Sequence, residues 1–305
     1  MKVLITGGAG FVGTNLAIKL LEIGHEVKIF DDLSTGLTQN IPKDSQFIEA
    51  SILDIEKLQS VAKGIEVIVH LGARGSVPRS INDPVATHNI NSTGTLNVLE
   101  AARANGSHYI FSSSSSVYGS NMKLPKNEDM VLRPLTPYAA SKMSGEALSL
   151  AYSKSYALPI STFRFFNIFG PWQRPDHAYA AVLPKWISKC LSGDEIEIFG
   201  DGQQTRDFTY VGTVVEIIAS CISNKVLHPE PVNLAYGNKI SLNQVVELLR
   251  KNFPDLKVKY LPPRKGDVLH SENDPKLLKT LYPDITVDSF QTSLQETINW
   301  FKNLS

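Results

Sequence analysis

Short apolar runs rich in β-branched residues alternate with longer segments of helical period along the first half of this 305-residue chain. The run KVLIT at residues 2–6 predicts a strand, and FVGTNLAIKLLEIG at residues 11–24 predicts an amphipathic helix that ends at Gly24. The same rhythm continues with strands predicted from EVKIF, VIVHLG, HYIFSS and ISTFRFF and helices from NSTGTLNVLEAARANG and PYAASKMSGEALSLAYSKSY. Because such alternation needs crossover connections, it constrains the chain to an α/β fold, a doubly wound parallel sheet with helices on both faces.

The alternation weakens after residue 166, where proline-rich and polar stretches begin. We therefore expect a large domain at residues 1–166, with a return segment around residues 207–231, and a smaller C-terminal α/β domain at residues 167–305. Open parallel sheets bind ligands outside the carboxyl ends of their strands. Functional residues are accordingly expected at those strand ends.

Charge and composition limit the partners of this chain. Lys plus Arg and Asp plus Glu each number 30, without a long run of like charge, so the sequence predicts neither nucleic acid nor an anionic membrane as a partner. The apolar start KVLIT is too short for a signal-peptide core, and no stretch approaches the roughly 20 apolar residues of a membrane span, which predicts a cytoplasmic protein. Cys190 and Cys221 stand far apart and the seven histidines have no metal-ligand spacing, so we expect no metal.

A glycine motif, TGGAGFVG, follows the first predicted strand and opens the first predicted helix, with Gly7, Gly10 and Gly13 in GxxGxxG spacing. Bare backbone and a helix N-terminus form a diphosphate site, although a tight structural turn has the same pattern. Asp31 ends the next predicted strand at about the 20-residue distance where an acid binds adenosine ribose hydroxyls. Because Asp31 and Asp32 would repel a 2′-phosphate and DDLSTG contains no arginine, the motif favours NAD over NADP; a solvated acidic turn is the alternative.

The serine run in FSSSSSVYGS, residues 111–120, follows a buried predicted strand, so it is expected at the lip of the ligand crevice and not in a linker. Further on, Thr136 and Pro137 predict a helix start that places Tyr138 and Lys142 at positions i and i+4, on one helix face. An ammonium one turn away, together with a cationic nicotinamide, would favour the tyrosine phenolate as a base. The alternative is that Tyr138 and Lys142 are an ordinary pair of side chains on one helix face, without a catalytic role.

Seven motifs in order, TGGAGFVG, DDLSTG, SSSSSVYG, YAASK, RFFNIFGP, GDGQQTRDF and PPRKGD, resemble the extended short-chain dehydrogenase/reductase family over nearly the whole chain. Within it the chain is most similar to NAD-dependent nucleotide-sugar 4-epimerases, above all bacterial UDP-N-acetylglucosamine 4-epimerases. The resemblance implies a Rossmann-like NAD-binding domain and a smaller C-terminal domain that binds the nucleotide sugar. It also implies that Tyr138 is the catalytic base, that Lys142 binds the nicotinamide ribose and tunes Tyr138, and that Ser114 is the catalytic serine.

The resemblance further implies two sets of contacts. One departure is Ser51 in EASILD, where the family often has the aspartate of an Asp-Ile pair against the adenine. The planar guanidinium groups of Arg206 and Arg264 suit the phosphate oxygens of the nucleotide diphosphate. Surface ion pairs are the alternative for these two arginines. The implied cofactor contacts are Gly7, Gly10, Phe11, Val12, Asp31, Asp32, Ser34, Thr35, Gly36, Ser51, Ile52, Leu71, Ala73, Arg74, Asn91, Tyr138, Lys142 and Phe166. The implied substrate contacts are Ser76, Ser114, Ser115, Ser116, Tyr138, Asn167, Ala181, Val182, Phe199, Arg206, Arg264, Asp267 and Ser271.

The activity implied by the resemblance is 4-epimerisation of a UDP-hexose through a transient 4-keto sugar. The resemblance places Ser271 where family members limited to plain sugars carry a large side chain and those that accept the acetyl group carry a small one, which favours UDP-N-acetylglucosamine and UDP-N-acetylgalactosamine over UDP-glucose and UDP-galactose. A surface-loop serine is the alternative. A dehydratase or a decarboxylase of the same fold needs acids where Ser115 and Ser116 stand, and a non-catalytic dinucleotide sensor would not need Tyr138 and Lys142. The resemblance also implies a homodimer built from helices at residues 91–106 and 137–156, whose apolar residues could alternatively face the sheet.

Overall fold

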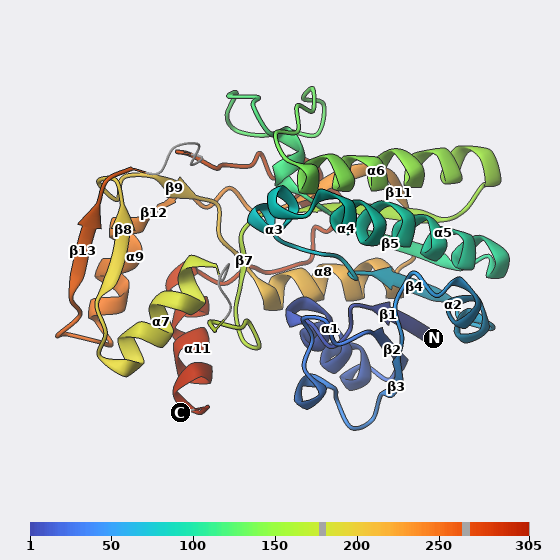
Figure 1. Cartoon of the computed structure of the whole chain (residues 1–305), viewed down its shortest axis with the longest axis horizontal. Helices are drawn as coiled ribbons and strands as arrows, with labels where there is room; N and C mark the ends of the chain where they lie inside the picture. Colours follow the sequence, from blue (N-terminus) through green and yellow to red (C-terminus); the bar gives the residue numbers. More distant parts are fainter. Residues whose placement is uncertain (177–180, 264–268, 305) are drawn as a thin grey trace.

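A computed structural model describes residues 1–176, 181–263 and 269–304 of the chain. Its centre is a seven-stranded sheet in the order β11-β6-β5-β4-β1-β2-β3, in which every neighbouring pair is parallel (Figure 1). This confirms the expected doubly wound parallel sheet. The strand order reverses between β1 and β4, so the ligand crevice is expected at the carboxyl ends of these strands. The strands are β1 Lys2–Thr6, β2 Glu26–Asp31, β3 Gln46–Glu49, β4 Val67–His70, β5 His108–Ser114, β6 Ile160–Phe165 and β11 His228–Leu234.

Helices cover both faces of the sheet, each over its own apolar core (Figure 1). On one face α1, Phe11–Glu22, packs against α8, Val211–Ser223, and the short α10, Lys276–Leu281, packs on β11. On the other face lie α2, Ile55–Ala62, α5, Gly94–Asn105, and α6, Pro137–Tyr156. A π-helical turn at Asn89–Thr93 leads into α5. Two short helices, α3 Val77–Asn82 and α4 Pro84–His88, pack against α6 near its start.

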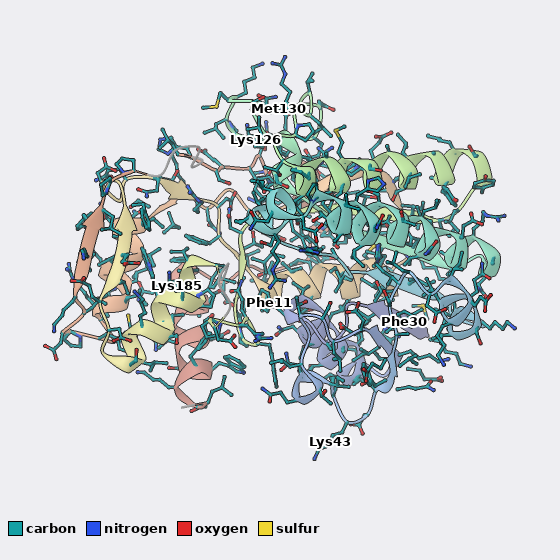
Figure 2. The ribbon with its side chains drawn as sticks, viewed as in Figure 1. Phe11, Phe30, Lys43, Lys126, Met130 and Lys185 are labelled. Carbon is teal, nitrogen blue, oxygen red and sulfur yellow. The ribbon has the colours of Figure 1, made fainter. Side chains whose placement is uncertain are left out.

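The remaining elements form a smaller layer with an apolar core of its own (Figure 1). Its helices are α7 Val182–Ser192, α9 Leu242–Arg250 and α11 Phe290–Lys302, and its strands pair in twos: β8 Ile196–Phe199 with β13 Val258–Leu261, β9 Thr205–Arg206 with β12 Ile240–Ser241, and β7 Ile168–Phe169 with β10 Thr209–Tyr210. The chain returns to the large layer through α8 and β11, and a second time through α10, whose Leu278 joins the core beneath α1. Phe11, the first residue of α1 (Figure 2), packs against the core between α1, α8 and the sheet.

Among the described residues, no helix combines the length and the apolar character that crossing a membrane requires.

Candidate active site

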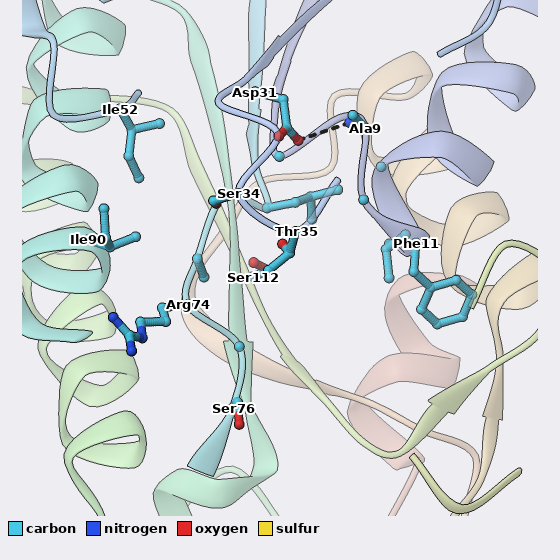
Figure 3. A pocket seen from close by; sticks show the side chains of 18 of the residues that line it. Ala9, Phe11, Asp31, Ser34, Thr35, Ile52, Arg74, Ser76, Ile90 and Ser112 are labelled. Carbon is cyan, nitrogen blue, oxygen red and sulfur yellow. Dashed lines mark hydrogen bonds between the residues drawn. The ribbon is translucent and has the colours of Figure 1, made fainter. Parts of the chain in front are cut away.

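A cavity of about 950 Å³ opens at the carboxyl ends of β1, β2, β4 and β5, where the strand order reverses (Figure 3). Most of the predicted cofactor residues line it, and so do all three predicted catalytic residues. The predicted residues in its lining are Gly7, Gly10, Phe11, Val12, Asp31, Asp32, Ser34, Thr35, Ile52, Leu71, Ala73, Arg74, Ser76, Ser114, Tyr138 and Lys142.

The glycine loop forms one end of the cavity. Gly7 has φ +72°, and a Cβ there would lie 2.6 Å from the backbone nitrogen of Gly72. A Cβ at Gly13 would lie 2.4 Å from the carbonyl oxygen of Gly7, so both positions require bare backbone. Gly10 is the N-cap of α1 and provides no side-chain hydrogen bond to the first turn. The N–H groups at this helix start are therefore presented to an anionic ligand, as a diphosphate requires.

Asp31 lies at the end of β2 and is tied to the loops on both sides. Its Oδ2 accepts a hydrogen bond from the Ala9 N–H at 3.0 Å (Figure 3), and its Oδ1 accepts one from the Leu33 N–H at 2.9 Å. Burial raises the pKa of Asp31, and the two backbone N–H groups partly oppose that shift. A Cβ at Gly36 would lie 2.8 Å from the Ala9 Cβ and 3.0 Å from Asp31 Oδ1, so Gly36 lets its loop pack behind this carboxylate.

The opposite wall near Ile52 differs in part from the sequence expectation. Ile52 lines the cavity and packs against α5, where a Cβ at Gly94 would lie 2.5 Å from the Ile52 Cδ1. Ser51 is not in the lining; its Oγ accepts a hydrogen bond from the Leu53 N–H at 3.3 Å. The Ser51 hydroxyl thus stabilises its own turn, and a direct contact of Ser51 with the cofactor stays a prediction.

The serines of the run differ in their surroundings. In β5, the Ser112 hydroxyl donates to the carbonyl oxygen of His70 at 2.9 Å, and the Ser113 hydroxyl donates to the Glu146 carboxylate. Ser114 ends the strand; its hydroxyl accepts hydrogen bonds from Ser116, and it interacts with the Tyr138 phenol closely enough to lower the Tyr138 pKa. Ser115 and Ser116 begin a 3-10 turn, η3, at Ser115–Tyr118. The strand end therefore presents Ser114, and not its neighbours in β5, to Tyr138.

Tyr138 and Lys142 lie in the first turns of α6, which begins at Pro137 with Thr136 as its N-cap, as predicted. The Lys142 ammonium donates to the Ser112 carbonyl oxygen at 2.7 Å, and burial lowers the Lys142 pKa to about 8. Burial raises the pKa of Tyr138, and only the hydrogen bond with Ser114 opposes this shift. Lys142 is not among the causes that shift the Tyr138 pKa, so its expected effect on the phenolate, together with a cationic nicotinamide, stays a prediction.

Two predicted cofactor residues lie behind the lining. Asn91, 1% exposed, accepts the Arg74 N–H at 2.7 Å and donates to the Ser141 hydroxyl at 3.0 Å. It thereby ties the loop after β4 to α6, the helix of Tyr138. Phe166 is buried in a small apolar cluster with Val117, Tyr118 and Ala235. Contacts of Asn91 and Phe166 with the cofactor stay predictions.

Three predicted substrate residues from separate segments come together beside the smaller layer. The exposed Asn167 donates to the Ser271 Oγ at 3.4 Å. The Ser271 N–H donates to the Thr205 carbonyl oxygen at 3.1 Å, and Arg206 donates to that same oxygen at 3.0 Å. Ala181 is the N-cap of α7, ahead of Val182, and Phe199 ends β8; Arg264 and Asp267 lie outside the described residues.

Asp207 organises this region and was not singled out from the sequence. Its side chain is 0% exposed and accepts three backbone N–H groups, from Gly237, Asn238 and Asn273, each at 3.0 Å. Its own carbonyl oxygen accepts the Asn167 side-chain N–H at 3.1 Å. Burial raises the Asp207 pKa to about 7. The signal was present in TRDF, because an acid between an arginine and an apolar strand needs partners when it is buried.

A second feature missed in the sequence is the segment PWQR at residues 171–174, called the strap below. Its residues Trp172, Gln173 and Arg174 line the cavity. The strap is tied at both ends: the Pro171 carbonyl oxygen accepts the Asn15 amide of α1 at 3.0 Å, and the Arg174 guanidinium donates to the Thr35 carbonyl oxygen at 3.3 Å. Gly13 of the predicted glycine motif also lines the cavity, and the other lining residues, which were not predicted, are Ala9, Phe30, Asn40, Ala50, Gly72, Gly75, Arg79, Ala86, Ile90, Ser112, Ser113 and Phe165.

The residues present fit a dinucleotide. The bare-backbone loop suits a diphosphate, and the carboxylate of Asp31 suits the hydroxyls of a ribose. The Gln173 Oε1 is buried and has no hydrogen-bond partner among the described residues, which suits a bound donor group in the cavity. Within the same described part of the chain, no cluster of three His, Cys, Asp or Glu side chains has a geometry that could hold a metal ion.

Comparisons with known proteins agree with this geometry. The sequence profile of the NAD dependent epimerase/dehydratase family matches residues 3–235. A putative UDP-glucose 4-epimerase of Methanocaldococcus jannaschii is 34% identical, with 99% of this chain and 98% of the relative covered. The structure of UDP-N-acetylglucosamine 4-epimerase from Methanobrevibacter ruminantium, in complex with UDP-N-acetylmuramic acid, superposes with a TM-score of 0.94 at 34% identity, covering 100% of this chain and 99% of the other. UDP-glucose 4-epimerase of Thermus thermophilus, in complex with NAD, superposes with a TM-score of 0.89 at 30% identity, covering 100% of both chains.

The family match and the cavity lead to the same cofactor. The profile covers the glycine loop, the serine run and the Tyr138 helix, which are the parts that meet in the cavity. The sequence-based choice of NAD is confirmed by the family and by a relative solved with NAD. The chain therefore belongs to the NAD-dependent epimerase/dehydratase family.

Proposed function

We propose that this protein is a UDP-hexose 4-epimerase that acts on UDP-N-acetylglucosamine and UDP-N-acetylgalactosamine, with weaker action on UDP-glucose and UDP-galactose. The observation that carries the proposal is that Ser114 and Tyr138, whose hydroxyl groups interact, lie together in the wall of the dinucleotide cavity. Two hydroxyl groups at this place can hold one sugar oxygen and move its proton. This is the chemistry that oxidation and reduction of a secondary alcohol require.

In the proposed mechanism Tyr138 removes the proton from the sugar 4-hydroxyl and later returns it, while Ser114 holds the same oxygen. NAD, when bound, supplies the hydride acceptor and donor for C4 of the sugar. Gly7, Gly10 and Asp31 would hold the diphosphate and a ribose of NAD. The buried Lys142 supplies a positive charge close to the ribose side of the cavity, which favours the phenolate of Tyr138.

We propose a division of labour between the two layers. The large layer, residues 1–166 with the return through α8 and β11, holds the cofactor, and the smaller layer holds the UDP part of the substrate through Asn167 and Arg206. The shared contacts of Asn167, Arg206 and Ser271 support this, since they come from three segments and meet in one place. Binding through the nucleotide leaves the 4-keto sugar free to turn, so that hydride can return to its opposite face.

The residues after Ser114 argue for epimerisation within a family that also includes dehydratases. Elimination of water needs an acid and a base in addition to the tyrosine. Ser115 and Ser116 occupy the adjoining turn η3 and carry hydroxyl groups that do not ionise near neutral pH. A decarboxylase is disfavoured for the same reason.

The test is a proton NMR assay of the purified holoprotein with UDP-glucose, UDP-galactose and their N-acetylated counterparts in parallel. The expected result is appearance of the anomeric signal of the C4 epimer, fastest for the N-acetylated pair. Replacing Tyr138 with Phe should abolish turnover while NAD stays bound. Persistent absence of every C4 epimer in the NAD-loaded wild type, or full activity in the Phe variant, would contradict the proposal.

We further propose that two copies assemble through α5 and α6. These helices pack side by side over one face of the sheet (Figure 1), and Leu96 of α5 and Tyr156 of α6 are 38% and 55% exposed. The same helices carry the dimer that the sequence resemblance implies. Light scattering at micromolar concentration should give the mass of a dimer, and a monomer would exclude this assembly.

A further inference from the structure

Ser116 makes two hydrogen bonds to the hydroxyl oxygen of Ser114. Its backbone N–H lies 3.2 Å from the Ser114 Oγ, and its own hydroxyl donates to the same oxygen at 3.0 Å. Both bonds arise because β5 ends at Ser114 in an extended conformation and η3 begins at the next residue. Ser116 thus lies next to the last residue of β5, within hydrogen-bond distance of its hydroxyl.

These two bonds determine what the Ser114 hydroxyl can do. A serine hydroxyl oxygen has two acceptor positions and one proton to donate. With both acceptor positions taken by Ser116, the remaining interaction of Ser114 is donation. Its proton is then available to the phenol oxygen of Tyr138, the other hydroxyl group with which Ser114 interacts. Hydrogen bonds accepted by a hydroxyl also strengthen the bond that it donates.

The Ser112 and Ser113 hydroxyl groups are engaged elsewhere. Ser112 donates to His70, and Ser113 donates to Glu146, which also forms a buried ion pair with Arg164. Those bonds attach β5 to β4 and to α6. Ser116 is therefore the residue of the run whose contacts bear on the orientation of Ser114.

We propose that Ser116 is a positioning residue for the reaction, which holds the Ser114 hydroxyl as a donor toward Tyr138 and the sugar oxygen. The inference rests on the proposed roles of Ser114 and Tyr138. A donor to the tyrosine oxygen stabilises the phenolate, whereas a freely rotating Ser114 could instead accept the phenol proton and stabilise the neutral form. Removing the Ser116 hydroxyl should therefore make Tyr138 a weaker acid.

The charged groups around Tyr138 stay the same in this experiment. Lys142 lies on the same helix, and the other charged side chains that line the cavity are Arg74, Arg79, Asp31, Asp32 and Arg174. Ser116 acts on the pair through its two bonds to the Ser114 oxygen, and its substitution leaves each of these charges in place. A change in the titration of Tyr138 after substitution of Ser116 thus reports on the serine pair.

The experiment compares Ser116→Ala, Ser116→Thr and the control Ser120→Ala as holoenzymes, with kcat and KM measured across pH. Ser120 is an exposed serine in the same turn region and allows the same substitution. Loss of the bond that the Ser116 hydroxyl donates to the Ser114 oxygen should lower kcat about tenfold in Ser116→Ala, which corresponds to about 1.4 kcal/mol. The acid limb of its kcat profile should move to higher pH, with KM changed less than about twofold. Ser116→Thr, which keeps the hydroxyl, should restore both values, and Ser120→Ala should match the wild type.

A second readout keeps this inference separate from the substrate proposal. The tyrosinate absorbance of each NAD-loaded protein is titrated with pH, and the Tyr138→Phe protein is subtracted to isolate Tyr138. The Tyr138 titration should move to higher pH in Ser116→Ala even if none of the four sugars is turned over. An unmoved titration and pH profile, or a loss confined to KM, would overturn the positioning role.

Discussion

Ser271 is the single residue whose size bears most directly on the choice of sugar. The Ser271 Oγ lies 3.4 Å from the side-chain amide of Asn167, close to the Arg206 guanidinium, which donates to the Thr205 carbonyl oxygen. A tyrosine at this position should overfill the space proposed for an N-acetyl group, at a cost of about 1 to 3 kcal/mol. We predict that Ser271→Tyr lowers kcat/KM for the two N-acetylated substrates about ten- to a hundredfold and leaves the two plain sugars nearly unchanged.

The measurement is kcat/KM for all four UDP-sugars in the wild type and in Ser271→Tyr. The plain sugars are the internal control, since they share the nucleotide and the reacting hydroxyl. An equal loss on all four substrates, or no loss, would show that Ser271 does not control access of the acetyl group.

At this scale the sequence predicted which residue types matter better than how they are bonded. Ser114, Tyr138 and Lys142 were predicted, and they line one cavity. The separate partners of Ser112, Ser113 and Ser116 could not be predicted, because five identical letters differ only in the strand end and the turn that orient them. Asp207 was missed because its three N–H donors come from residues far along the chain.

At the scale of elements, the strap at residues 171–174 is tied to α1 and to the loop of Thr35, on the side of the cavity predicted to hold the cofactor. Arg174 holds the Thr35 carbonyl oxygen at 3.3 Å and forms an ion pair with Asp176 at 2.7 Å, while Asn15 holds the other end. Removing the guanidinium should free this end of the strap, so we predict that Arg174→Ala releases NAD about five- to tenfold faster, as loss of about 1 kcal/mol implies. The chemical step at saturating NAD should be unaffected, because the bonds of Arg174 go to Thr35 and Asp176 and leave the Ser114–Tyr138 pair intact.

The release rate is measured by trapping NAD with an excess of a competing dehydrogenase. Arg250→Ala is the matched control, because Arg250 pairs with Glu247 on the exposed side of α9, away from the cavity. Unchanged release in Arg174→Ala, or equal acceleration in both variants, would exclude a retaining role for the strap.

The elements with strong local signals were predicted best. The structure has β1 at Lys2–Thr6 and α6 at Pro137–Tyr156, the same bounds as predicted, because an apolar β-branched run and a Thr-Pro helix start define them locally. The short α3 and α4, each beginning with a proline in its first turn, were not anticipated, since five or six residues do not establish a period. The strap depends on residues 35 and 174 meeting in space, which no local pattern indicates.

For the whole molecule, two buried histidines couple folding to pH. Burial is the main cause that lowers the pKa of His70 to about 3, with Lys142 contributing, and burial lowers the pKa of His108 to about 4. Both rings lie in the central sheet, His70 between the Thr6 and Thr95 hydroxyls and His108 against the Ser161 hydroxyl. In the unfolded chain a histidine titrates near pH 6.5. Between about pH 6.5 and 4 the unfolded chain therefore binds two protons that the folded protein does not.

This difference makes the protein less stable as pH falls through that window, and the contribution is fully present only above about pH 6.5. Each such proton lowers the free energy of unfolding by about 1.4 kcal/mol per pH unit within the window. We predict that His108→Gln, which keeps a polar partner for Ser161, reduces the slope of unfolding free energy against pH by about that amount, measured by urea unfolding from pH 7 to pH 5. His88→Gln is the control, because His88 is exposed at the end of α4 and its replacement should leave the slope unchanged. A His108→Gln slope equal to that of the wild type would mean that His108 is protonated in the folded protein as readily as in the unfolded chain.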